Sequence, residues 1–109
     1  MNDTTTTIQD LKDQFKQFVH ERNWEEFHNP KSTSMNIVAE AAELMEIFMW
    51  VDNNGSQKVL EDNRQAVEDE VADIMFALFD FCNHSNIDIT QAVAHKMVLT
   101  AQKYPPVSK

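Results

Sequence analysis

Glycine and proline are scarce in this chain, and their scarcity limits what it can fold into. Only one Gly and three Pro occur among 109 residues. Because these residues mark most turns, we expect few turns and long regular elements. Apolar residues also recur at helical spacing, as at Ile8, Leu11, Phe15 and Phe18. The pattern predicts an all-α single domain, similar to a four-helix bundle with short connections.

The first two helices are placed by caps and by a break between them. A stripe of apolar residues predicts a helix over residues 7–23, capped by Thr6 or Thr7. Pro30 disfavours helical backbone in the residue before it. We therefore expect the second helix to run from about residue 34 to residue 51.

The last two helices follow in the second half of the chain. The third should begin near Leu60 or Gln65 and continue through the apolar stretch "IMFALF". Asp88 or Thr90 can cap the fourth, which should end before Pro105. All four belong to one domain, 1–109, and we expect its ends, residues 1–6 and 106–109, to be flexible.

The charge balance restricts the partners of this chain. Nine basic residues against 18 acidic ones give a net charge of −9. Such a chain is a poor candidate for binding a nucleic acid polymer or an anionic membrane. A small anionic substrate is compatible with it if a divalent cation neutralises the site.

Cysteine content and the first residues suggest a compartment. Cys82 is the single cysteine, so an internal disulfide and a cysteine-based zinc site are excluded. We expect it to be a small buried apolar residue in a reducing environment. The first ten residues lack the basic start and apolar core of a secretory signal peptide, and we expect a cytoplasmic protein.

Two pairs of carboxylates are the feature with the clearest chemistry. Glu40 and Glu43 lie three residues apart, and Glu70 and Asp73 repeat this spacing in the next long helix. Residues three apart in a helix project from nearly one face. On adjacent antiparallel helices the two pairs would converge, and like charges brought so close need a cation or protons. Carboxylate oxygens favour Mg²⁺ or Mn²⁺ over zinc.

Other acidic residues have simpler interpretations. Glu61 and Glu68 are read as solvated helix surface. Glu46 continues the ridge of Glu40 and Glu43 and is either a further ligand, a general base or a surface residue. Asp80 follows Asp73 by seven residues and is either a hydrogen-bonding residue behind the site or a surface residue.

These residues carry a resemblance to a known family. The pattern Glu40-Ala-Ala-Glu43, followed after 26 residues by Glu70-Val-Ala-Asp73, resembles the ExxE…ExxD signature of MazG-like all-α nucleoside triphosphate pyrophosphohydrolases. The stretches "RNWEEFHNP", "EIFMW" and "NIDI" are similar to the short branch that includes the dCTP pyrophosphatases. The likeness covers roughly residues 10–105.

The resemblance implies a reaction and a site. It implies hydrolysis of a nucleoside triphosphate between the α and β phosphates, releasing a monophosphate and pyrophosphate, as in the removal of non-standard or surplus dNTPs. Glu40, Glu43, Glu70 and Asp73 would hold Mg²⁺, with Mn²⁺ as an alternative. Glu43 or Glu46 would take the proton from the attacking water. The substrate-binding residues that it implies, with the alternative of an ordinary structural role for each, are Trp24, His28, Asn36, Trp50, Lys96, Lys103 and Tyr104.

Two positions depart from the family pattern. Thr100 stands where relatives often have Asn, which puts one substrate contact in doubt. Phe15 stands where some dCTP-preferring relatives carry a histidine, which weakens any transfer of their base preference to this chain.

Other functions and the assembly state complete the expectations. One alternative is a relative of the phosphoribosyl-ATP pyrophosphohydrolases with the same metal core. A non-enzymatic alternative is a helical oligomerisation or antitoxin-like module with an acidic face. Six Met and seven Phe exceed what a small bundle can easily bury. We therefore expect a homodimer or homotetramer, as the family also implies.

Overall fold

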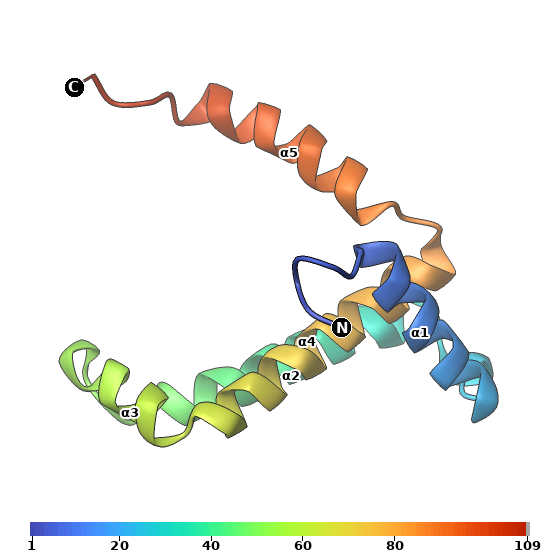
Figure 1. Ribbon diagram of the computed structural model, residues 1–109, viewed down its shortest axis with the longest axis horizontal. Helices are drawn as coiled ribbons and strands as arrows, with labels where there is room; N and C mark the ends of the chain where they lie inside the picture. Colours follow the sequence, from blue (N-terminus) through green and yellow to red (C-terminus); the bar gives the residue numbers. More distant parts are fainter. Residues whose placement is uncertain (109) are drawn as a thin grey trace.

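The computed structural model describes residues 1–108, and over these residues it contains helices and no strands. Figure 1 shows the arrangement. The elements in chain order are α1 (Ile8–Glu21), η1 (Glu25–Phe27), α2 (Pro30–Phe48), η2 (Asn53–Gly55), α3 (Ser56–Asp62), α4 (Arg64–Ser85) and α5 (Ile89–Lys103). The all-α prediction is confirmed. Lys109, at the end of the tail predicted to be flexible, lies outside the described residues.

Side chains that cap helices explain most of the boundaries. Thr7 caps α1 in a reciprocal arrangement with Asp10, and Asp88 caps α5 by accepting a hydrogen bond from the backbone N–H of Gln91. Both agree with the sequence. At the end of α4, Asn86 takes a left-handed backbone conformation with φ 55°, which asparagine tolerates better than most residues.

The start of α2 differs from the expectation. We expected the helix from about residue 34 to residue 51, but it runs from Pro30 to Phe48. Asn29 is the cap and forms a reciprocal pair with Ser32, while Pro30 occupies the first helical position. A proline is favoured there because its missing N–H would have no helical partner. Pro30 therefore starts this helix, although it disfavours helix at the residue before it.

The centre of the fold is an antiparallel pair of helices, α2 and α4, which lie side by side in Figure 1. Thr33 near the start of α2 contacts His84 near the end of α4. α1 packs against α4, and the short α3 reverses the chain between α2 and α4. The buried apolar residues are Val19, Ala77, Phe79 and Cys82. Cys82 is thus buried as expected.

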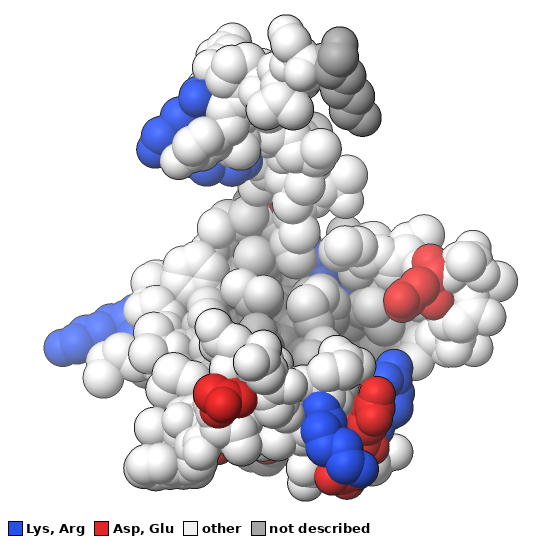
Figure 2. Space-filling view, turned by 90° about the vertical axis from the view of Figure 1, so that its left-hand side faces the viewer, with Lys and Arg blue, Asp and Glu red and all other residues white. Residues whose placement is uncertain are grey.

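The last helix stands away from the others. α5 makes only isolated contacts with the rest of the described chain, and Figure 1 shows it projecting from the end of α4. In Figure 2 the part containing α5 is joined to the rest by a narrow waist. The radius of gyration is 16.9 Å, against about 13 Å for a compact domain of this length. A single copy is therefore an open structure.

Within residues 1–108, we find no helix with the length and the apolar character that crossing a membrane requires.

Candidate functional site

The antiparallel pairing of α2 and α4 brings the two carboxylate pairs together. Glu40 and Glu43 face Glu70 and Asp73, and one carboxylate oxygen from each of the four lies within 4.8 Å of the others. Glu43 is exposed at the rim, whereas the other three are partly buried. The convergence that the sequence predicted is therefore present in the fold.

This acidic cluster is electrostatically unfavourable without a cation. Burial raises the pKa of Glu40, and the carboxylates of Glu43 and Asp73 raise it further. Burial also raises the pKa of Glu70, again reinforced by the neighbouring carboxylates and first by Glu43. The Oε2 atoms of Glu40 and Glu70 are buried and have no hydrogen-bond partner among the described residues. Unpartnered buried oxygens of this kind suit the ligand set of a hard divalent cation.

An aromatic pocket of about 580 Å³ opens beside the acidic cluster. Glu40 and Asp73 form one end of it, and the rings of Phe15, Phe18 and Trp24 line its side. Phe76 on α4 stacks on Phe15, with ring centroids 4.9 Å apart. The pocket therefore offers apolar ring faces next to a group of carboxylates, which fits a flat, partly apolar ligand with an anionic end.

The other end of the pocket is polar. His28, Asn36 and Asp80 line it, and Nδ1 of His28 lies 2.9 Å from Oδ2 of Asp80. Burial raises the pKa of Asp80, while the nearby imidazoles of His28 and His84 act in the opposite direction. The partly buried Asp80 is thus a hydrogen-bonding residue inside the fold, which was one of its two interpretations from sequence.

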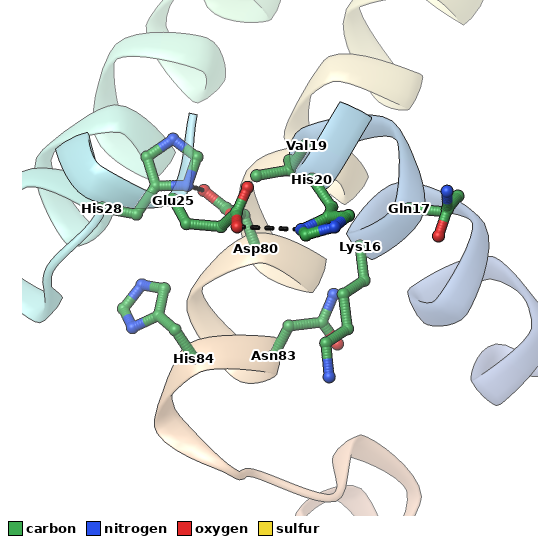
Figure 3. A pocket seen from close by; sticks show the side chains of 9 residues that line it. All are labelled: Lys16, Gln17, Val19, His20, Glu25, His28, Asp80, Asn83 and His84. Atoms are coloured by element: carbon green, nitrogen blue, oxygen red, sulfur yellow. Dashed lines mark hydrogen bonds and ion pairs between the residues drawn. The ribbon is translucent and has the colours of Figure 1, made fainter. Parts of the chain in front are cut away.

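Behind this polar end lies a smaller cavity of about 350 Å³, shown in Figure 3. His28 and Asp80 form its wall together with His20 and Glu25, which are joined by a contact of 3.0 Å. His84 belongs to the same wall and reaches the hydroxyl of Thr33 at 2.9 Å. The His28–Asp80 pair therefore separates two cavities.

Several residues expected in the site lie elsewhere in a single chain. Trp50 follows the end of α2 and is 84% exposed, outside the aromatic pocket. Lys96 lies on α5 and lines a shallow apolar groove with α4, while Lys103 and Tyr104 are at the far end of α5. Glu46 is exposed and lies outside the four-carboxylate cluster.

Other pocket residues were not predicted from the sequence. Phe76 and Ala77 follow Asp73 by three and four residues, which places them on the same face of α4. Their spacing from Asp73 could therefore have indicated both residues as part of the pocket. Phe18 and Leu11 come from α1, and their contribution depends on how α1 packs against α4, which no local pattern specifies.

Comparison with known proteins places this geometry in a family. The MazG-like family model matches residues 35–109. Mouse dCTP pyrophosphatase 1 is 33% identical over 101 residues, which is 91% of this chain, and the human protein is 31% identical over the same share. The chain spans 59% of the length of these two relatives.

A solved structure agrees in fold along nearly the whole chain. The crystal structure of a pyrophosphatase from Archaeoglobus fulgidus superposes with a TM-score of 0.88 at 33% identity, covering 97% of this chain and 99% of that one. The acidic cluster lies within the segment that the family model matches. This chain belongs to the MazG-like family.

Proposed function

We propose that this protein is a Mg²⁺-dependent nucleoside triphosphate pyrophosphohydrolase that cleaves between the α and β phosphates. The observation that carries the proposal is the position of the acidic cluster at one end of an aromatic pocket. Relatives named as dCTP pyrophosphatases, and a solved structure named as a pyrophosphatase, support the same reaction class. Turnover of surplus or non-standard dNTPs is the role that we expect.

The residues of the cluster fit a divalent cation. Glu40, Glu70 and Asp73 present oxygens from two helices, and the unpartnered Oε2 atoms of Glu40 and Glu70 are available as ligands. When bound, Mg²⁺ or Mn²⁺ would neutralise the triphosphate and lower the pKa of a water molecule. Such compensation would allow this acidic protein to bind an acidic substrate.

The chain's own residues would orient the substrate. Trp24 and the stacked rings of Phe15 and Phe76 offer faces on which a nucleobase can stack. With the base held there, the phosphates would extend toward Glu40 and Asp73. The substrate would then bind in one orientation, with its base among the aromatic rings and its triphosphate at the acidic cluster.

In the reaction, a water oxygen attacks the α phosphorus and the bond from that phosphorus to the bridging oxygen breaks. Pyrophosphate leaves with the bonding electrons, and a carboxylate accepts the proton of the water. Glu43 is suited to this role because it is exposed yet close to Glu40 and Glu70. Glu46, one turn further along α2 and exposed, is the alternative base.

We also propose that the active form is a homodimer or homotetramer. The surface area of one copy is 8677 Å², against about 6,200 Å² for a compact monomer of this mass. Apolar residues of α5, among them Met97 and Leu99, are exposed. Burying α5 on a second copy would reduce this excess and could bring Lys96, Lys103 and Tyr104 to a neighbouring pocket.

The experiment is a dNTP panel with Mg²⁺ and identification of the products by ion-exchange chromatography. We expect monophosphate and pyrophosphate, and no activity for Glu43→Ala or Asp73→Ala, both folded by circular dichroism. Glu61→Gln is the matched control, because it removes an exposed carboxylate on α3. Release of orthophosphate alone, or no turnover of any nucleotide, would contradict the proposal. A non-enzymatic module would show no turnover, and a phosphoribosyl-ATP pyrophosphohydrolase would accept only that substrate.

A further inference from the structure

Asp80 lies at the end of the aromatic pocket opposite the acidic cluster. It follows Asp73 on α4 by seven residues, or nearly two full turns, so both carboxylates lie on one face of the helix. The rise between the two positions is about 10.5 Å. Ala77, between them, lines the pocket with only a methyl group, which leaves room for a ligand along this face. A ligand with its phosphates at Asp73 would therefore extend toward Asp80.

One oxygen of Asp80 is held, and the other is available. Oδ2 accepts a hydrogen bond from Nδ1 of His28 at 2.9 Å, as Figure 3 shows. Among residues 1–108, Oδ2 is the oxygen of Asp80 for which a partner is found. The side chain of Asp80 is 14% exposed and lines both cavities, so a ligand in either cavity can approach this carboxylate. A carboxylate oxygen only accepts hydrogen bonds, so a ligand there must bring a donor.

The residues around Asp80 are fixed from two sides. The backbone N–H of His28 donates to the carbonyl of Glu25, which anchors the base of the imidazole. On the other side, the hydroxyl of buried Thr33 donates its one proton to the carbonyl of Asn29 at 2.8 Å. The hydroxyl oxygen must therefore accept from Nε2–H of His84, which sets the tautomer of that ring. Each imidazole therefore has a side-chain partner of its own, Asp80 for His28 and Thr33 for His84.

We propose that Asp80 is a specificity-determining residue, whose free carboxylate oxygen accepts a hydrogen bond from the exocyclic amino group of the substrate's nucleobase, with His28 as the positioning residue. This inference rests on the proposed function. It assigns Asp80 a direct contact with the substrate and His28 an indirect role. The preferred substrates are nucleotides of amino-bearing bases.

The chemistry of base edges gives the proposal its discriminating power. Cytosine and adenine carry an amino group where uracil and hypoxanthine carry a carbonyl oxygen. An amino group donates to the carboxylate, whereas a carbonyl oxygen placed there leaves two acceptors facing each other. Losing a hydrogen bond to a charged group costs at least about tenfold in affinity. Nucleotides of uracil and hypoxanthine, the oxo bases, should therefore be poor substrates.

The test compares matched pairs of substrates, dCTP with dUTP and dATP with dITP, by kcat/KM. The wild-type protein should favour the amino member of at least one pair by about tenfold or more. Asp80→Asn is the informative variant, because its amide oxygen can still accept from His28 while its NH₂ group faces the base. It should lose the amino preference or reverse it toward the oxo base, an outcome that a purely structural role of Asp80 would not produce. Asp80→Ala should lose the preference without a gain for the oxo bases.

Asp69→Asn is the matched control, since it makes the same substitution on the exposed face of α4. It should leave the ratio of kcat/KM within each substrate pair unchanged. The proposal is overturned if Asp80→Asn keeps the wild-type ratios. It is also overturned, without any variant, if the wild-type protein cleaves both members of each pair equally well or favours the oxo bases. Failure of the proposed function would look different, because then no dNTP is cleaved to pyrophosphate by the wild-type protein.

Discussion

Replacing Glu40 with glutamine should have opposite effects on stability with and without metal. In the metal-free protein, Glu40 lies in a group of four carboxylates whose oxygens approach within 4.8 Å. Two full charges at that distance repel by about 3.5 kcal/mol at an effective dielectric constant of 20. Partial exposure and proton uptake by the cluster reduce the net effect to about 1 kcal/mol. Glu40→Gln should therefore raise the metal-free melting temperature by about 4–8 °C.

In the presence of metal the sign changes. Glu40→Gln removes one carboxylate ligand and should weaken Mg²⁺ binding. If binding is tenfold weaker, saturating Mg²⁺ stabilises the variant by about 1.4 kcal/mol less than it stabilises the wild-type protein. The melting temperature of the wild-type protein should thus rise more than that of the variant when Mg²⁺ is added. Glu61→Gln, on exposed α3, should change stability by no more than about 0.5 kcal/mol in either condition.

The assay is differential scanning calorimetry in EDTA and in millimolar MgCl₂ at pH 7. The expected pattern is a higher melting temperature for Glu40→Gln in EDTA and a smaller increase on adding Mg²⁺. If Glu40→Gln melts lower in EDTA and shows the full wild-type response to Mg²⁺, the reasoning about the cluster is refuted.

Four further predictions concern pH, the pocket, the core and the last helix. Because the pKa values of Glu40 and Glu70 are raised in the folded state, the native protein holds protons that the unfolded chain has released. Metal-free stability should therefore fall as the pH rises above about 4.5, and urea unfolding at pH 5 and pH 7 would detect this; greater stability at pH 7 would contradict it. Trp24→Ala should raise KM about tenfold or more and Trp24→Phe much less, and steady-state kinetics with equal KM values would argue against stacking. Phe79→Ala should destabilise by about 3–5 kcal/mol, since Phe79 is 2% exposed, and an unchanged urea midpoint would exclude its place in the core. Met97→Glu should yield a smaller species by light scattering, because Met97 is 67% exposed on the helix expected to join copies; an unchanged mass would rule out that surface as the interface.

Local sequence predicted the long helices and the acidic cluster, but not the short helix α3 as a separate element. Helical spacing and capping residues such as Thr7 and Asp88 act over a few residues, so they can be read directly. The two carboxylate pairs could be joined because a short connection between long helices requires antiparallel packing. The start of α2 is an exception. Pro30 disfavours helix at the residue before it, but it is itself favoured at the first helical position, so α2 begins at Pro30 and not near residue 34.

The aromatic pocket could be predicted only in part. Phe76 lies on the face of α4 that Asp73 already defined, so spacing indicates it. Phe18 enters from α1, whose packing angle depends on contacts far apart in sequence. The position of α5 could not be predicted either, because it makes only isolated contacts with the rest of the described chain and most of its apolar residues are exposed. Spacing also placed Asp80 close to the face of Asp73, but its pairing with His28 required the fold.

The central claim is that the acidic cluster and the aromatic pocket direct water to the α phosphorus of a nucleoside triphosphate. Hydrolysis in water labelled with heavy oxygen tests this most directly, with mass spectrometry of both products. We predict that the label enters the nucleoside monophosphate and that the pyrophosphate remains unlabelled. Label in the pyrophosphate, or formation of a diphosphate with labelled orthophosphate, would contradict attack at the α phosphorus.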